Sequence, residues 1–147
     1  MINSTEVKFL GLILDDTLNW KKHIEQLVNK MSSACYALRN LRPLLSQDTL
    51  KTVYYACLHS LLSYGIICWG GSSQAKKIFI LQKKSIKIVT NSKTTDSCRK
   101  HFKRLKIMTV YTQYIYSVIM HTINNKHLYK PNKEIHKYET RNMNDLH

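Results

Sequence analysis

The chain has 147 residues, of which 44% are hydrophobic, and its 23 Lys and Arg against nine Asp and Glu give a formal net charge of +14. This length fits one domain or a piece of a larger protein and argues against a complete multi-domain enzyme. The hydrophobic fraction excludes disorder over most of the chain. The positive excess favours a polyanionic partner.

The first two expected elements are a strand and a long helix. Residues 7–14 form a short apolar run closed by two aspartates, which predicts a buried strand or hairpin arm that ends in a turn. From Trp20 to Leu41, apolar residues recur every three or four positions and predict an amphipathic helix of about six turns. Asn19 is its expected N-cap, and Pro43 follows its end.

The rest of the chain alternates helical patterns with short breaks. A second helix is expected from its N-cap Ser46 to Leu62, along an unbroken apolar stripe. Residues 64–70 break the helical period and are expected to be extended, ahead of a Gly-Ser loop. Three more helices are expected at about 74–89, about 96–105 and from about 109 onward.

These elements predict a mainly α-helical protein. An N-terminal strand or hairpin arm over residues 1–18 is expected to precede a bundle of four to five helices over residues 19–123. Residues 124–147 lack hydrophobic periodicity and are expected to form an irregular or disordered tail.

The four cysteines form no C-x-x-C pair, and no secretory signal precedes them. We therefore expect reduced thiols and an intracellular location, in the nucleus or the cytoplasm. Cys98 and His101 are the only close metal-ligand pair, which is insufficient for a zinc site. The uncharged stretch 52–75 is long enough to span a bilayer. Polar residues interrupt it, so we expect a buried helix and no membrane partner, although a membrane-associated basic protein stays an alternative.

Positive charge is concentrated between Lys76 and Lys106, a segment with eleven basic residues and one acidic residue, Asp96. Two basic helix faces joined by a polar loop can follow a phosphate backbone. No zinc-finger, homeodomain or RNP-type motif is present, so base-specific recognition is not expected. The candidate nucleic-acid-binding residues are Lys76, Lys77, Lys83, Lys84, Lys87, Arg99, Lys100, Lys103, Arg104 and Lys106.

The adjacent aspartates Asp15 and Asp16 raise the question of catalysis, because polymerases hold two divalent metals with paired carboxylates. No third carboxylate of the chain has a strand context, and Asp residues are common in turns. We therefore expect a turn, no catalytic residues, no resident metal and no cofactor in this chain.

Seven short motifs occur together along the chain: Lys8–Leu12, Leu14–Asp15, Leu18–Ile24, Tyr36–Leu44, Ser63–Gly70, Leu81–Ile88 and Phe102–Ile107. In this order they resemble the region just after the polymerase active site in reverse transcriptases of non-LTR retrotransposons, of the jockey- and RTE-like kind. A short tail motif, His136-x-Tyr138-x-Thr140-Arg141, is similar to the end of the same region.

The resemblance implies that the chain is a fragment of an RNA-directed DNA polymerase. It places Phe9, Leu10 and Gly11 in the last palm segment, as primer-grip-like residues. The following helices would form a thumb that holds the template–primer duplex and packs on a palm domain. The family's catalytic aspartates lie in an upstream aromatic-x-Asp-Asp motif, which this sequence lacks. Mg²⁺ would serve the parent polymerase, so only nucleic-acid binding is expected of this chain.

A second interpretation belongs to a different class of protein. If the helices once packed on a palm domain, their exposed apolar faces would make the chain a non-catalytic interaction module. A large exposed apolar patch would favour this interpretation.

Overall fold

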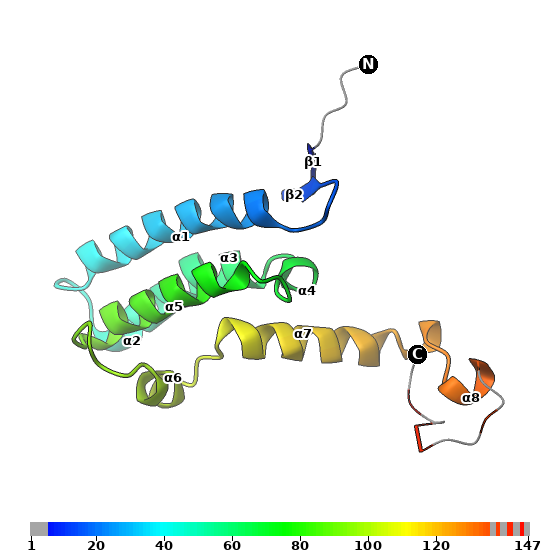
Figure 1. Ribbon diagram of the computed structural model, residues 1–147. Helices are drawn as coiled ribbons and strands as arrows, with labels where there is room; N and C mark the ends of the chain where they lie inside the picture. The colour runs from blue at the N-terminus through cyan, green and yellow to red at the C-terminus, as the bar shows by residue number, and fades with distance from the viewer. Residues whose placement is uncertain (1–5, 136–137, 139–140, 143–144, 146–147) are drawn as a thin grey trace. The chain divides into compact units, whose positions relative to one another are not determined.

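The computed structural model describes residues 6–135, 138, 141–142 and 145, and it is mainly helical with an N-terminal two-stranded hairpin (Figure 1). This confirms the expected fold class. The chain divides into two compact units, Met1–Ile115 and Tyr116–His147. The elements are β1 (Glu6–Phe9), β2 (Leu12–Asp15), α1 (Lys21–Leu41), α2 (Gln47–Tyr54), the π-helical segment η1 (Tyr55–His59), α3 (Ser60–Ser63), α4 (Ile66–Trp69), α5 (Ala75–Thr90), α6 (Arg99–Leu105), α7 (Val110–Asn124), the 3-10 turn η2 (Lys126–Leu128) and α8 (Asn132–Ile135).

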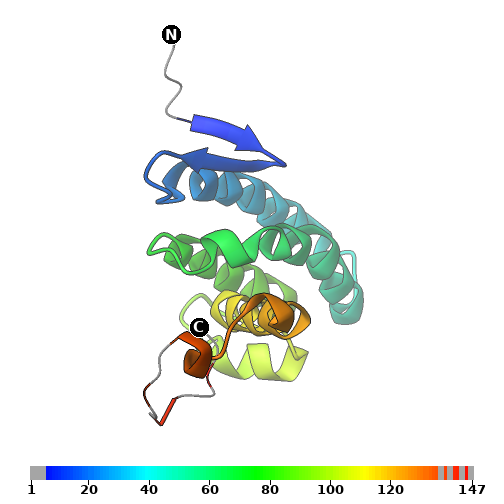
Figure 2. The same cartoon turned by 90° about the vertical axis from the view of Figure 1, so that its right-hand side faces the viewer.

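The N-terminal arm is a hairpin, which is one of the two forms that the sequence allows. Strands β1 and β2 are antiparallel, with Glu6 opposite Asp15 and Phe9 opposite Leu12. The two residues between them, Leu10 and Gly11, have φ angles of 46° and 82°. Two consecutive positive φ angles are typical of the type I′ turns that join two strands tightly. Figure 2 shows the hairpin beside α1.

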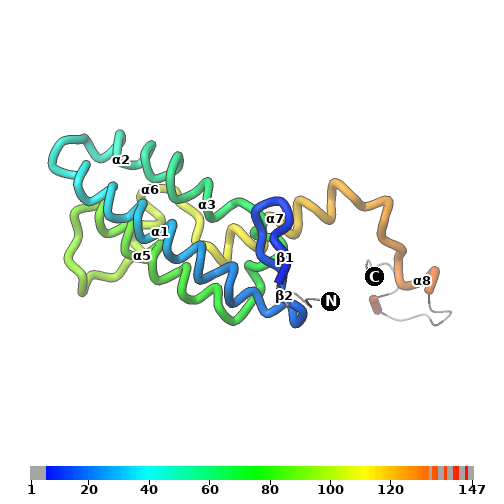
Figure 3. Tube along the Cα trace, turned by 90° about the horizontal axis from the view of Figure 1, so that it is seen from above, coloured from blue at the N-terminus to red at the C-terminus, as the bar shows by residue number. Residues whose placement is uncertain are grey.

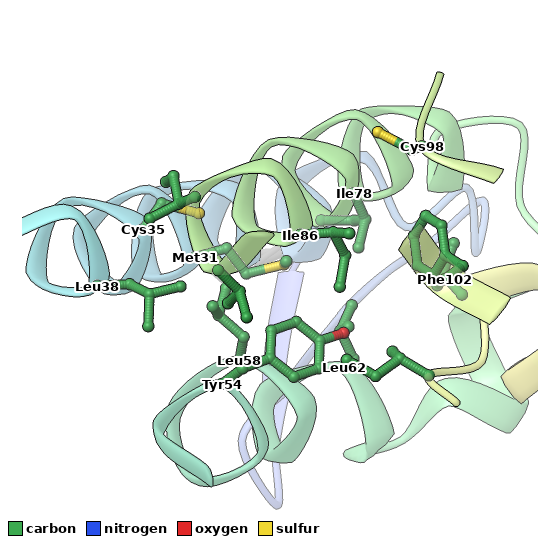
Figure 4. Close-up of a cluster of buried hydrophobic side chains, with 14 of the residues drawn as sticks. Met31, Cys35, Leu38, Tyr54, Leu58, Leu62, Ile78, Ile86, Cys98 and Phe102 are labelled. Atoms are coloured by element: carbon green, nitrogen blue, oxygen red, sulfur yellow. The ribbon is translucent and has the colours of Figure 1, made fainter. Parts of the chain in front are cut away.

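The first unit has its core between α1, α5 and the helical run α2–α3, which lie side by side (Figures 1 and 3). The helix α1 contributes the stripe that its sequence period predicts, including Ile24, Met31 and Leu38, all buried. The close-up in Figure 4 shows part of this cluster. The expected cap of α2 forms, because the Ser46 side chain accepts the Thr49 N–H. The prediction that Asn19 is the N-cap of α1 is wrong: the N-cap is Trp20, in a left-handed conformation with φ 62°. Asn19 lies one residue earlier, and its Oδ1 accepts the Lys21 N–H at 2.8 Å.

The second expected helix is interrupted by one π-helical turn. Its buried residues are Leu50, Tyr54, Leu58 and Leu62, one every four positions. In an α-helix, a four-residue step rotates a side chain about 40° beyond a full turn, so a stripe at this spacing drifts out of the core. The wider turn of η1 compensates for that drift. Cys57, which the apolar stripe includes, is exposed for the same reason.

The prediction that residues 64–70 are extended is wrong. Only Tyr64 has an extended conformation, and Gly65 (φ 61°) begins the helical turn α4. The turn places the Trp69 side chain inside the core, where its indole Nε1 donates to the Tyr64 carbonyl at 3.0 Å. Burial of this large ring outweighs the β propensity of the segment, since an aromatic residue makes one of the largest contributions to a core.

The second unit contains the end of α7, the turn η2 and the single-turn helix α8. The Asn132 N–H donates to the Asp145 carbonyl at 2.9 Å, which closes a loop within this unit. His136 and Thr140 of the tail motif lie outside the described residues. Among the residues that the structure describes, no helix has both the length and the apolar character needed to cross a membrane.

Candidate nucleic-acid interface

Half of the predicted basic residues border one groove of about 820 Å³, formed by α5, α6 and the segment that joins α6 to α7. We call it the basic groove. All of its walls belong to the first unit. Its apolar floor consists of Phe79, Phe102, Ile107 and Met108. Its cations are Lys83, Lys87, Arg99, Lys103 and Lys106.

The helix α5 supplies one wall because its own apolar stripe is buried in the core. Burial of Ile78 and Ile86 leaves Lys83 and Lys87 at the border of the groove. The ammonium of Lys83 lies 4.8 Å from the centre of the Phe79 ring, which is a cation–π contact. The ammonium of Lys87 donates to the carbonyl of Thr94 in the loop before α6.

The helix α6 supplies a second wall and is held against α5 by its N-cap residue Cys98 and by the buried ring of Phe102. The thiol of Cys98 donates to the Lys83 carbonyl at 3.6 Å. Phe102 is buried and packs into the same cluster as Ile86 (Figure 4). Lys106 ends α6 in a left-handed conformation with φ 55°, which turns the chain back along the groove. A non-glycine residue in this conformation costs roughly 1 kcal/mol, which the surrounding contacts offset.

A single buried glutamine fixes the third wall. Gln82, almost fully buried, donates through Nε2 to the Tyr54 hydroxyl at 3.0 Å and to the Met108 carbonyl at 2.9 Å. Its Oε1 accepts the Val110 N–H at 2.9 Å. These bonds satisfy polar groups that would otherwise be buried without partners. Gln82 therefore connects α2, α5 and the beginning of α7.

Aromatic rings form a continuous cluster under the cations. Phe79 stacks on Phe102 with 6.3 Å between ring centres and lies 5.1 Å from Tyr111. The sequence interpretation did not include Phe79, Met108 or Gln82 among the site residues. The spacing of Phe79 and Lys83, four residues apart on a helix, is a signal that could have identified the first of them.

The other five predicted basic residues do not border the groove. Lys76, Lys77 and Lys84 on α5, and Lys100 and Arg104 on α6, are all exposed. Lys84 faces α1: burial raises the pKa of the Cys35 thiol, and the positive charges of Lys84 and Arg39 oppose that rise. Adjacent residues on a helix point about 100° apart, so Lys83 and Lys84 serve different surfaces.

Asp15 and Asp96 accept hydrogen bonds from nearby residues of their own turns. Asp15 Oδ1 accepts the Thr17 N–H at 3.1 Å and hydroxyl at 2.8 Å, and also the Asn19 N–H at 3.1 Å. The Thr17 hydroxyl is the main cause of the lowered pKa of Asp15. This is the geometry of a turn held by its own aspartate. In the groove, Asp96 Oδ2 accepts the Lys93 N–H at 2.9 Å.

Metal ligands are not gathered in the part of the chain that the structure describes, where no group of three or more His, Cys, Asp or Glu could hold an ion. The close pair Cys98 and His101 has other partners: His101 Nε2 lies 2.9 Å from the Ser92 hydroxyl. All four cysteines are free thiols.

Phe9, Leu10 and Gly11, which the resemblance predicts to be primer-grip-like, lie at the tip of the hairpin. Phe9 is 59% exposed and Leu10 is 73% exposed. The Tyr64 hydroxyl donates to the Leu10 carbonyl, and a Cβ added to Gly11 would lie 3.6 Å from the Tyr64 ring. The Lys8–Leu12 and Ser63–Gly70 motifs, which are far apart in the sequence, are therefore in contact. Figures 1 and 3 show the hairpin near the beginning of α1 and α6 near the end of α5, at opposite ends of the bundle.

Comparison of the chain with protein-family models, with curated proteins and with solved structures finds no match.

Proposed function

We propose that this chain binds nucleic acid without sequence preference, as a thumb-like fragment of a non-LTR retrotransposon reverse transcriptase. The observation that carries the proposal is the convergence of five cations from three segments on one groove that contains a single acid. Such a surface attracts a phosphate backbone, whatever its sequence. The ordered sequence motifs support the parentage, and through it a template–primer as the natural ligand.

The salt dependence of binding tests this proposal. Each cation that meets a phosphate releases a condensed counterion, so five contacts with duplex DNA predict a log–log salt slope of roughly −4 to −5. Affinity near physiological salt should be on the order of micromolar or weaker. The measurement is a fluorescence-anisotropy titration at several salt concentrations.

Two triple variants with the same change in charge test whether the basic groove is the surface that binds nucleic acid. Replacing three groove cations by Ala should reduce the slope by up to about three units. Replacing three cations of α5 outside the groove should leave the slope nearly unchanged. Circular dichroism checks that both variants stay helical. Equal effects of the two variants would contradict a role for the groove. The variants are Lys83→Ala/Lys87→Ala/Lys103→Ala and Lys76→Ala/Lys77→Ala/Lys84→Ala.

This chain alone is not expected to synthesise DNA. Two metals and a nucleotide need more carboxylates than a turn aspartate and its neighbour supply. Primer extension with Mg²⁺ or Mn²⁺ should therefore give no product. Extension that disappears in Asp15→Asn/Asp16→Asn would instead make these residues catalytic.

Genomic sequence tests the parentage independently of any binding measurement. An in-frame aromatic-x-Asp-Asp motif a few dozen codons upstream of Met1 would support a reverse transcriptase. A full-length intergenic region with no trace of polymerase motifs would contradict it.

A second candidate function is a protein-interaction module, and the hairpin favours it. Val7, Phe9 and Leu10 are all exposed, and among the residues that the structure describes β1 pairs with β2 alone. An open edge with apolar side chains is a surface on which another protein can pack. A folded chain that binds no nucleic acid at low salt would leave this candidate ahead.

A further inference from the structure

The floor of the basic groove has features that phosphate binding does not require. Met108 is 37% exposed and Phe79 is half-buried, so part of the apolar floor is accessible. A base that stacks on Phe79 would take the place of the Lys83 ammonium, which lies 4.8 Å from the ring centre and could move to an adjacent phosphate. Phosphate contacts need donors and positive charge only. An aromatic and thioether floor adds a surface for a flat apolar group.

We propose that the basic groove holds an unpaired base of a single-stranded nucleic acid on the floor formed by Phe79 and Met108, while the surrounding cations hold the adjacent phosphates. This inference rests on the proposed function and narrows it to a class of nucleic acid. It predicts that the chain prefers single strands to duplexes.

The arrangement of the walls supports this occupant. Lys83 and Lys87 stand on α5, Arg99 and Lys103 stand on α6, and all four line the groove together with the apolar floor. A strand in the groove can therefore meet cations from both helices. The volume of about 820 Å³ is within the range of small-ligand sites and suits one or two nucleotides.

A duplex fits this surface less well. Its bases are stacked and paired, and they present only their edges in the grooves. A duplex can thus reach the cations at the rim but cannot place a ring face on Phe79. In a single strand every base offers a face to an aromatic side chain, whatever its identity.

The charge of the groove distinguishes a nucleic acid from an acidic peptide. The centre of a peptide-binding groove is depleted in charged residues. Nucleic-acid interfaces are much more positive and more polar. Here five cations surround four floor residues, and the only acid, Asp96, already accepts a backbone N–H.

The decisive experiment compares three probes of equal length with the unmodified protein: single-stranded DNA, the same strand with abasic sites, and the duplex. Anisotropy titrations at one salt concentration give the three affinities. Single-stranded DNA should bind at least about fivefold more tightly than the abasic strand, since stacking on an aromatic residue contributes this much or more. Equal affinity for the normal and abasic strands would overturn the proposal while leaving phosphate binding intact.

A variant pair assigns the effect to the floor. Phe79→Leu keeps an apolar residue of similar size, and it should remove most of the difference between the normal and abasic strands. Tyr36→Leu changes an aromatic residue that is 66% exposed on α1, outside the groove, and it should preserve the difference. A Phe79→Leu protein that keeps the full difference would overturn the assignment.

Two other results separate this inference from the function on which it rests. Absence of binding to all three probes at low salt would reject nucleic-acid binding itself. Displacement of single-stranded DNA by an equimolar acidic amphipathic peptide would overturn the inference in favour of a protein partner.

Discussion

The hairpin and the basic groove both expose apolar surface, but they differ in the charges around it. At the hairpin tip, Phe9 and Leu10 are exposed, and the strand that leads to them, Glu6–Phe9, carries one basic residue, Lys8. In the groove, five basic side chains surround the apolar floor. An exposed apolar surface alone indicates a protein neighbour, whereas the same surface within a ring of cations indicates a polyanion that also offers flat apolar groups.

The two regions are also attached to the bundle in different ways. The groove depends on the fully paired Gln82 amide at its base. The hairpin depends on contacts of its turn and second strand: the Tyr64 hydroxyl with the Leu10 carbonyl, Leu12 against Gly65, and the Ile13 N–H with His23. Substitutions at these positions should therefore affect one region without the other.

The largest effect is expected from Gln82→Leu. The substitution leaves the Val110 N–H and the Tyr54 hydroxyl buried without their partner, at a cost of roughly 1–3 kcal/mol for each unpaired group, and it also removes the donor to the part-buried Met108 carbonyl. We expect a decrease of about 2–5 kcal/mol in the free energy of unfolding, together with weaker nucleic-acid binding. Urea denaturation followed by circular dichroism measures the first, and anisotropy the second.

Gln113→Leu is the matched control for that variant. Within the described residues, Gln113 Oε1 is buried and has no hydrogen-bond partner. Removing an unpaired polar atom should be close to neutral or slightly stabilising. Equal losses at positions 82 and 113 would show that the amide bonds of Gln82 do not hold the groove together.

A smaller effect, at the contact between α4 and the hairpin, is expected from Gly65→Ala. A Cβ at this position would lie 2.7 Å from Leu12 Cδ2, and the φ angle of 61° disfavours any side chain. Strain and displacement together should cost about 1–3 kcal/mol. Amide hydrogen exchange should become faster at Leu12–Asp15 and stay unchanged at the groove. Unchanged exchange in β2 would mean that Gly65 does not hold the hairpin.

The contrast between the regions also explains what the sequence could reveal. The helical periods of α1 and α5 predict their buried faces, and the cap of α2 is visible as Ser46. The groove floor is a different problem, because Phe79, Phe102 and Met108 come from three segments that only the tertiary fold brings together.

The same limit applies to single residues. Lys83 and Lys84 are equivalent in a count of charges, and the packing of α5 in the bundle decides that Lys83 borders the groove and Lys84 does not. Trp69 joins the core through a glycine-initiated turn whose sequence resembles that of a strand. Local pattern therefore predicts elements well, and it predicts sites only where one element supplies them.

A still smaller effect is a loss of stability at mildly acidic pH, which we expect from protonation of His23 and His59. Burial, and then the charge of Lys30, lowers the pKa of His23 below 6.5, and burial lowers the pKa of His59 in the same direction. Because the unfolded histidines take up protons first, stability is complete above 6.5 and is lost as the pH falls through 6.5 toward the folded pKa values. Protonation also removes the acceptor of the Ile13 N–H, His23 Nδ1.

The test is the urea midpoint at pH 7.5 and at pH 5.5. His23→Asn keeps an oxygen near the position of Nδ1 and cannot titrate, so its midpoint should depend less on pH. The remaining dependence should come from His59. A wild-type midpoint that rises toward pH 5.5 would contradict the assignment.

The smallest effect is expected from Leu10→Asn, which should raise the free energy of unfolding. The variant also tests whether the hairpin tip contacts a primer or another protein. Leu10 adopts a φ angle of 46° next to Gly11 at 82°, where Asn-Gly is the preferred pair. Leu10→Asn should therefore stabilise the chain by up to about 1 kcal/mol, since Asn tolerates the left-handed conformation better than Leu. The same change removes an apolar side chain that is 73% exposed. If the tip contacts a primer, as the resemblance implies, duplex affinity should change with it. If the tip faces a protein, affinity for nucleic acid should match that of the wild type while stability rises. Urea denaturation and an anisotropy titration of the same preparation give both readings, and a destabilised Leu10→Asn chain would contradict the turn geometry itself.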